Sequence, residues 1–393
     1  MNVLVFDISI SGHHSEYIHH LVDYLNYHPS EDFYYFLLHP DFSKTFPYIK
    51  QKATQCSNIR FVEISSEEFD YSNSGGKLVK SIRYLRVLNK YAKKLSIQHA
   101  ILMHFNLFQF GLSIYFPRYT VSGILLAQFY RLDCVSLKKK MLFLRKYLQT
   151  LFYSINPKIK KIFILNDQDS VCYFNQKFRT KKFQTLPDPI PDWDLDLTID
   201  VRKKYLIAQN RVIFLHCGSL DERKGTLDIL RSIDNIDIND QKKICFLFAG
   251  RACNKDLESC LNKMINYYNN SSSVQIIWES GFIANSILKC MFDQSDCVLI
   301  PYKNSESSSG ILGHAVRSGK PVIGPDRGLL GELIKANKLG YVIEHPTNIA
   351  SELCKFLNRV EIFARNESFF NDHAPVIFSE KVIQSSIQLR NKK

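Results

Sequence analysis

Short apolar runs alternate with amphipathic stretches along most of the chain. In the N-terminal half, apolar runs of strand length recur near residues 3–6, 33–38, 60–64, 100–104, 120–126 and 161–165. Stretches with helical spacing lie between them, and the one that begins at Ser15 has its inward positions at Tyr17, Ile18, Leu21, Val22 and Leu25. Runs that are apolar throughout are typical of parallel strands covered by helices on both faces. The pattern therefore predicts an α/β fold.

A second series of the same kind runs from Val212 to about Phe356. Its strands are predicted at residues 212–217, 244–250, 297–300 and 322–324. A proline-rich stretch at residues 186–192 separates the two series and is the best candidate for a linker. The sequence therefore predicts two units, each with a parallel sheet of the Rossmann type.

Length and composition are those of a large soluble protein. The 393 residues suffice for two domains, and 45% hydrophobic composition supports full cores. The ten cysteines form no Cys-x-x-Cys pair, so we expect buried, reduced thiols in a cytosolic protein. Residues 1–7 have the pattern of a strand, and we expect no signal peptide there. Polar residues interrupt the longest uncharged stretch, 95–117, which we do not expect to span a membrane.

The net charge of +13 is concentrated in two segments of the N-terminal half. Residues 77–95 hold seven basic and no acidic residues, and residues 131–183 hold thirteen basic and three acidic residues. These segments together carry +17, so the rest of the chain is −4. Residues 77–95 also predict an amphipathic helix, with inward positions at Leu78, Ile82, Leu85, Leu88 or Asn89, Ala92 and Leu95.

Three interpretations of this charge were compared. A solvated surface is one, and a face that docks on an anionic membrane is another, because apolar residues lie among the basic ones. The apolar residues are Leu142, Phe143, Leu144, Leu148, Leu151 and Phe152. Nucleic acid is the weakest interpretation, because no nucleic-acid-binding motif is present. Our hypothesis is a peripheral protein on the inner face of a membrane.

Two turns carry the candidate chemistry. Residues 301–310, PYKNSESSSG, join a strand to a helix, and such a small-residue turn presents backbone N–H groups for an anion. Glu306 offers a carboxylate to hydroxyl groups beside it. Upstream, Gly218 and Ser219 follow a strand and lead to Arg223 and Lys224. An arginine fork and a compact lysine charge suit phosphate oxygens, although an isolated pair of this kind is commonly a solvated turn.

Residues 301–332 resemble the nucleotide-sugar site of glycosyltransferase family 4, the group 1 glycosyl transferases, which have the glycosyltransferase B fold. In that family two Glu residues are separated by seven residues. The second Glu is followed by an Ala, a Gly-x-Pro-Val-Ile strand and a Gly-x-x-Glu turn. Glu306 fits the first Glu, but His314 stands in place of the second. The Arg-Lys-Gly turn at 223–225 and a Gly-Phe-x turn at 281–283 also fit the family.

The resemblance implies two Rossmann-like domains that face each other across a cleft. Residues 1–186 would bind the acceptor, residues 187–375 the nucleotide-sugar, and the helix at 376–393 would return to the first domain. It further implies transfer of a sugar from a nucleoside-diphosphate sugar to a hydroxyl of a saccharide or lipid-linked acceptor. We also expect retention of configuration, no metal and no cofactor beyond the donor. A place in cell-surface polysaccharide or glycolipid assembly is expected as well.

The resemblance also assigns roles to residues. Glu306, Lys224 and Arg223 are expected to be catalytic, with the two basic residues on the leaving diphosphate. The expected donor-binding residues are Gly218, Ser219, Phe282, Ile283, Ser308, Ser309, Gly310, Ile311 and His314, the last at the ribose. On the acceptor side we expect Gly12, His13 and His14 after the first strand, and His104 at the end of another, because α/β sheets bind ligands at the carboxyl ends of their strands.

Three alternatives remain. A metal-dependent transferase of the other common fold needs an Asp-x-Asp pair, and Asp167–Asp169 and Asp194–Asp196 have that spacing, which we interpret as chance. With His314 in place of a Glu, the chain could be an idle nucleotide-sugar-binding partner. A sugar-nucleotide epimerase shares the fold, but no residue pair here identifies one.

Overall fold

A computed structural model describes residues 1–393 except 11, 133–135, 192, 194–197, 360–362 and 388–393. The chain divides into two compact units. Unit 1 comprises Met1–Pro189 and the stretch that begins at Ala374, and unit 2 comprises Ile190–His373. The sequence-based boundaries were 186/187 and 375/376.

Unit 1 is built on a seven-stranded, all-parallel sheet in the order β3-β2-β1-β4-β5-β6-β7. The strands are β1 (Asn2–Asp7), β2 (Phe33–Leu38), β3 (Ile59–Glu63), β4 (His99–Leu102), β5 (Thr120–Ile124), β6 (Ile159–Leu165) and β7 (Phe183–Leu186). The helices are α1 (His14–Tyr27), α2 (Phe42–Thr45), α3 (Pro47–Thr54), α4 (Ser66–Asn73), α5 (Lys77–Lys94), α6 (Gln109–Ile114), α7 (Leu137–Ile155), α8 (Gln168–Lys177) and α18 (Pro375–Ile387).

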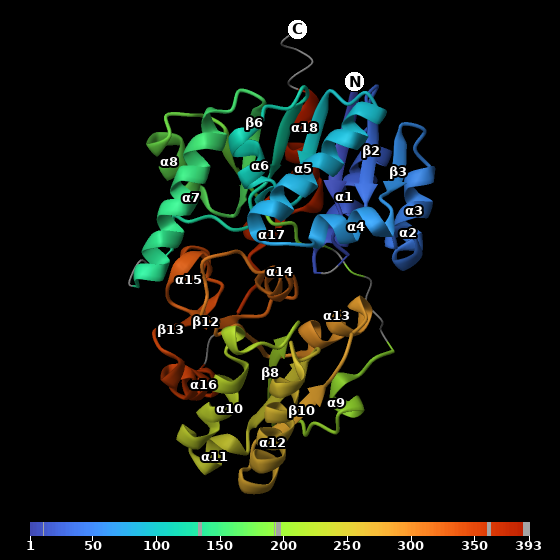
Figure 1. Ribbon diagram of the computed structural model, residues 1–393. Helices are drawn as coiled ribbons and strands as arrows, with labels where there is room; N and C mark the ends of the chain where they lie inside the picture. Colours follow the sequence, from blue (N-terminus) through green and yellow to red (C-terminus); the bar gives the residue numbers. More distant parts are fainter. Residues whose placement is uncertain (11, 133–135, 192, 194–197, 360–362, 388–393) are drawn as a thin grey trace. The chain divides into compact units, whose positions relative to one another are not determined.

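The sheet of unit 1 separates two apolar cores. On β1, Leu4 and Phe6 point into one core and Val3 and Val5 into the other, because side chains alternate along a strand. Helices α5, α6, α7 and α8 cover the first core, and α5 and α6 lie in front of the sheet in Figure 1. Helices α1, α3 and α18 cover the second. Both faces are thus buried, as the uniformly apolar strands predicted.

Unit 2 repeats this design with six parallel strands in the order β10-β9-β8-β11-β12-β13. The strands are β8 (Val212–Cys217), β9 (Ile244–Ala249), β10 (Gln275–Glu279), β11 (Cys297–Leu299), β12 (Val322–Pro325) and β13 (Gly340–Ile343). The helices are α9 (Val201–Lys204), α10 (Thr226–Arg231), α11 (Ile238–Gln241), α12 (Lys255–Ser271), α13 (Asn285–Gln294), α14 (Gly310–Arg317), α15 (Gly328–Ala336), α16 (Ile349–Leu357) and α17 (Glu367–Asp372). The prediction of two Rossmann-like units is confirmed.

Some details of the expected pattern are wrong. Leu78 is exposed, because it lies on the first turn of α5, where residues 77–79 are all open to solvent. Strand β4 ends at Leu102, and His104 instead precedes a 3-10 turn, Phe105–Leu107. The sequence analysis also missed β7, β10 and β13. No helix in the described part of the chain is long and apolar enough to cross a bilayer.

Helix α18 belongs to unit 1 although it follows unit 2 in sequence. Phe378 is fully buried beside Tyr17 of α1, with ring centroids 4.8 Å apart, and Val382 and Ile383 extend the contact. The last segment of the chain therefore completes the second core of unit 1.

We predict that Phe378→Ala lowers the free energy of unfolding of unit 1 by about 3–5 kcal/mol, since it empties a buried aromatic site. The matched control is Val376→Ala on the same helix, which removes an exposed side chain and should cost less than about 0.5 kcal/mol. Urea unfolding followed by circular dichroism measures both. Equal losses in the two variants would contradict the packing of α18 described here.

Candidate functional site

The order of strands in unit 2 opens a site between β8 and β11. These strands are neighbours, but the connection from β8 leads to β9 on one side and the connection from β11 leads to β12 on the other. Ligands of open α/β sheets bind at such a switch point, outside the carboxyl ends of the strands. Gly218 and Ser219 follow β8 here, and the loop of residues 300–309 follows β11.

The turn of residues 223–225 lies directly against the loop after β11. Gly225 has a φ of +77°, and a Cβ there would lie 2.4 Å from the carbonyl oxygen of Pro301. Only glycine fits so close an approach in this conformation. The backbone N–H of Lys303 also donates to the carbonyl oxygen of Arg223 at 2.8 Å. The two sequence motifs therefore meet in one place.

Lys224 is the central cation of this place. A Cβ on Gly218 would lie 3.2 Å from the Lys224 Nζ and 3.7 Å from the Ile311 Cδ1, so these three residues come together. The ammonium also lies 5.6 Å from the centroid of the Tyr302 ring. Burial lowers the Lys224 pKa. In the described part of the chain no carboxylate forms an ion pair with this ammonium, which is the electrostatic situation of a site for an anion.

Arg223 has a different environment. Its guanidinium donates to Asp221 Oδ2 from Nε at 3.0 Å and from Nη2 at 2.7 Å, and its side chain is exposed. This pairing raises the Arg223 pKa and lowers that of Asp221. The structure thus separates the two predicted phosphate ligands: Lys224 lies inside the site, and Arg223 lies at its rim, oriented by Asp221.

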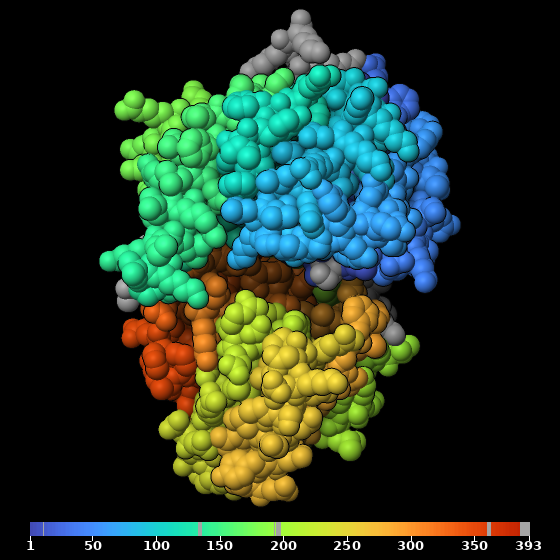
Figure 2. Space-filling view, viewed as in Figure 1, coloured from blue at the N-terminus to red at the C-terminus, as the bar shows by residue number. Residues whose placement is uncertain are grey.

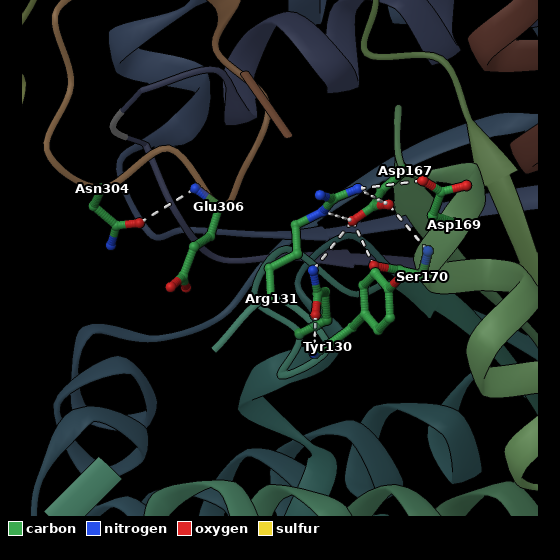
Figure 3. A network of polar contacts seen from close by, with 8 residues as sticks. Tyr130, Arg131, Asp167, Asp169, Ser170, Asn304 and Glu306 are labelled. Carbon is green, nitrogen blue, oxygen red and sulfur yellow. Dashed lines mark hydrogen bonds and ion pairs between the residues drawn. The ribbon is translucent and has the colours of Figure 1, made fainter. Parts of the chain in front are cut away.

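The loop that carries Glu306 is held from behind. The Leu330 N–H donates to the Ser305 carbonyl at 3.1 Å, and a Cβ on Gly328 would lie 2.5 Å from that carbonyl oxygen. The Glu306 N–H donates to Asn304 Oδ1 at 3.4 Å (Figure 3). Ser309 is the N-cap of α14 and Gly310 is its first residue, so the N–H groups of the first helical turn open on this loop.

His314 lies in an aromatic stack within unit 2. Its ring lies 3.8 Å from the centroid of Trp193 and 5.5 Å from that of Phe292. Burial lowers the His314 pKa to about 3, so the imidazole is neutral at physiological pH. The residue that replaces the second Glu of the motif is therefore packed by its ring faces, a contact that the sequence analysis did not anticipate.

The turn of residues 281–283 is open to solvent. Gly281 has a φ of +109°. The Phe282 side chain is 87% exposed, which is unusual for a ring of this size, while Ile283 packs partly against the apolar core of unit 2. An exposed ring beside a strand end is suited to stacking on a planar ligand.

A cluster of histidines marks the corresponding switch point of unit 1, between β1 and β4. Asp7 ends β1, and its Oδ2 accepts a hydrogen bond at 2.8 Å from Nδ1 of the buried His14. His13 stacks on His14 at 5.0 Å, and the His104 ring lies 5.7 Å from that of His14. Burial lowers the pKa of His104 to about 4 and also lowers that of His13.

This arrangement brings three predicted residues together with one that was missed. His13, His14 and His104 lie side by side, whereas Asp7 had no assigned role. Gly12 has a φ of +67° and starts the turn into α1, while Ser11 lies outside the described residues. A hydrogen bond from His14 Nδ1 to Asp7 fixes the tautomer in which Nε2 accepts protons. The cluster can bind hydroxyl groups.

Of the two Asp-x-Asp pairs, the structure describes only the one at 167–169. Asp167 caps α8 through the Ser170 N–H at 3.0 Å, and its carboxylate receives the Arg131 guanidinium from Nε and Nη2, both at 2.9 Å (Figure 3). These bonds lower the Asp167 pKa against the effect of burial. Asp167 therefore has a structural role in unit 1. Asp194–Asp196 lies outside the described residues.

Comparison with known proteins agrees with this geometry. Residues 198–361 match the family model described as glycosyl transferases group 1. This segment is therefore similar to group 1 glycosyl transferases. The matched segment contains the site around Lys224. Among curated proteins, no sequence matches the chain.

Solved structures with the same fold extend over both units. WaaG, a glycosyltransferase involved in lipopolysaccharide biosynthesis, has 14% identity and a TM-score of 0.65 over 98% of this chain and 99% of its own. Anabaena HepE in complex with UDP and glucose has 12% identity and a TM-score of 0.62 over 100% and 99%. A UDP-forming trehalose-phosphate synthase from Burkholderia vietnamiensis has 11% identity and a TM-score of 0.66 over 99% of each chain. The chain thus has the glycosyltransferase B fold.

Unit 2 contains a further buried histidine. His216, on β8, bonds the Leu299 carbonyl through Nδ1 at 2.8 Å and the Thr226 hydroxyl through Nε2 at 3.0 Å. It ties β8 to β11 and to the start of α10. Tyr302, Asp221 and Trp193 are the other site neighbours that the sequence did not reveal, because only packing selects them among many similar residues.

We predict that His314 makes unit 2 less stable in acid. Its folded-state pKa is lowered, so the unfolded chain binds a proton below about 6.5 that the folded domain takes up only near 3. The stability is present above that range and is lost as the pH falls through it. His314→Phe should reduce the slope of unfolding free energy between pH 6 and 4 by about 1 kcal/mol per pH unit.

Tryptophan fluorescence during urea unfolding measures this slope, because both tryptophans, Trp193 and Trp278, lie in unit 2. The matched control is His345→Phe at an exposed position, which is expected to leave the slope unchanged. An unchanged slope in His314→Phe would contradict the buried, neutral state of this ring.

Proposed function

We propose that this chain transfers a sugar from a nucleoside-diphosphate sugar to a hydroxyl acceptor. The observation that carries the proposal is the half-buried Lys224 ammonium, which forms no ion pair with a carboxylate in the described part of the chain and lies against the Gly218 turn. A partly desolvated cation of this kind favours an anion, and a diphosphate leaving group supplies one. Proteins of similar fold include one solved with UDP and one that is UDP-forming, which supports the same proposal.

The role that we propose for each residue follows from its position in the site. Lys224, the N–H groups at the start of α14 and Arg223 at the rim stabilise the charge that develops on the diphosphate. Glu306 binds hydroxyls of the donor sugar, Phe282 stacks on the nucleobase, and Ser219, Ser308 and Ile311 complete the donor site. The anomeric carbon–oxygen bond breaks, a bond to the acceptor oxygen forms, and the acceptor proton leaves with the nucleoside diphosphate. We propose retention of configuration and no metal.

The acceptor side belongs to unit 1 in this proposal. The Asp7–His14 pair, with His13 and His104, offers ring nitrogens to a saccharide or lipid-linked acceptor, and the lowered pKa values of His13 and His104 favour their neutral forms. Since WaaG is described as acting in lipopolysaccharide biosynthesis, we propose cell-surface polysaccharide or glycolipid assembly as the setting. The protein would act in the cytoplasm, peripherally at the inner face of the membrane.

We predict that Lys224→Ala lowers kcat/KM by about 10²-fold or more, as the loss of one contact to a developing anion commonly does. The assay supplies a panel of nucleotide-sugars in excess EDTA and analyses products, so that transfer, donor hydrolysis and epimerisation are told apart. Lys263→Ala, an exposed lysine of α12, is the matched control and should retain activity. Near-normal turnover of Lys224→Ala would refute the assignment, and loss of activity in EDTA would point to a metal.

We further predict that Glu306→Gln lowers kcat/KM by about 10²-fold while leaving the affinity for the free nucleoside diphosphate unchanged, because the carboxylate acts on the sugar. His314→Phe should lose less, since its contribution is packing. Steady-state kinetics and calorimetric titration with the nucleoside diphosphate measure the two quantities. A greater kinetic loss in His314→Phe would mean that the motif is misaligned.

A further inference from the structure

Helix α7 has two apolar faces, and in the described part of the chain only one of them packs against the core of unit 1. Phe143, Tyr147 and Leu151 pack against the first core of unit 1, and Thr150 and Tyr153 are buried there. A second set of large apolar side chains points outward, each between 42% and 76% exposed: Leu137, Met141, Leu144, Leu148, Phe152 and Ile155.

The outward set forms one continuous stripe. Its members are three or four residues apart, and this is the spacing of neighbours on one face of an α-helix. The stripe therefore runs the whole length of α7, from Leu137 to Ile155, or roughly 28 Å at the rise of an α-helix. Soluble surfaces rarely expose apolar side chains in so extended a row. In Figure 1 this green helix runs along the flank of unit 1, and Figure 2 shows its atoms at the surface.

This finding corrects the sequence-based choice of apolar residues. Phe143 and Leu151 were expected among the membrane-facing residues, but they pack inward. Leu144, Leu148 and Phe152 do face outward, and Leu137, Met141 and Ile155 were missed. Helical periodicity predicts two faces here, but which face meets the sheet is decided by the packing of α7 on α6.

All the charged residues of α7 have the same sign. The helix holds five basic residues and no acidic one. Lys138, Lys140 and Arg145 are exposed and, at 3.6 residues per turn, flank the stripe on its two sides. Helix α5, with seven basic residues and no acidic one, belongs to the same layer, since α6 joins it to α7 through hydrogen bonds from Gly111 N to Ser81 Oγ and from Ser113 Oγ to Gln149 O.

We propose that α7 lies flat on an anionic phospholipid bilayer, with the stripe in the boundary between headgroups and acyl chains. An apolar row edged by basic side chains, on a helix too polar to span, is the pattern of an interfacial helix. The flanking lysines and arginine lie against lipid phosphates. All charged side chains of α7 are basic, which matches the single negative sign of an anionic lipid surface. The proposal is independent of the sugar-transfer activity.

The test is co-sedimentation of the full chain with vesicles. One vesicle type is phosphatidylcholine alone, and the other is equal parts phosphatidylcholine and phosphatidylglycerol. We expect at least about tenfold tighter binding to the anionic vesicles, and loss of that preference in about 1 M NaCl, where the Debye length is about 3 Å. Leu144→Glu/Leu148→Glu should weaken binding about tenfold or more.

The matched control is Leu206→Glu/Ile238→Glu, which changes two exposed aliphatic residues of unit 2 by the same charge and should bind as the wild type does. If the α7 double variant does not fold by circular dichroism, Lys138→Gln/Lys140→Gln/Arg145→Gln removes only exposed charge and should lose the anionic preference. Equal binding to both vesicle types, or binding to neither, overturns the proposal. So does a wild-type dimer that the α7 variant converts to a monomer, because the stripe would then be covered by a second copy.

Discussion

Every strand in each of the two sheets is parallel, and this constraint determines where chemistry can occur. Parallel neighbours cannot be joined by tight turns, so each connection crosses a face of the sheet, usually as a helix. All the loops that follow strands therefore meet at one edge, and they diverge where the strand order reverses. Lys224 and Glu306 of unit 2, and Asp7 and His104 of unit 1, lie near the carboxyl ends of the strands beside those reversals.

Close backbone contacts then set the proposed donor site. Glycine at 225 allows the turn to approach the Pro301 carbonyl of the loop after β11, and Gly218 lets the Lys224 ammonium approach the main chain. The result is a half-buried cation that forms no ion pair with a carboxylate in the described part of the chain, while Arg223, one residue away, is exposed and paired with Asp221. Two adjacent residues of one motif thus have different electrostatic states. The difference arises mainly from burial, because desolvation penalises the Lys224 ammonium more than the exposed Arg223 guanidinium.

Unit 1 combines a stable interior with an unusual surface. Its second core is completed by α18, and its first core uses one face of α7. The outer face of α7 remains apolar although the rest of that helix is rich in lysine. A surface of this kind costs solubility unless something covers it. The histidines proposed to bind the acceptor and the proposed lipid-facing helix lie in the same unit, which suits an acceptor held at a membrane.

The sequence by itself determined the two α/β units, the family resemblance of the second, and the positions of Lys224 and Glu306, because uniformly apolar runs and small-residue turns are local signals. It also predicted that His13, His14 and His104 follow strands. Only the tertiary structure decided that Asp7 bonds His14, that Trp193 stacks on His314, and that Phe143 faces inward while Leu144 faces outward. These outcomes depend on which side of an element meets a partner distant in sequence. The periodicity of a helix gives its faces, but only three-dimensional packing selects the one that is buried.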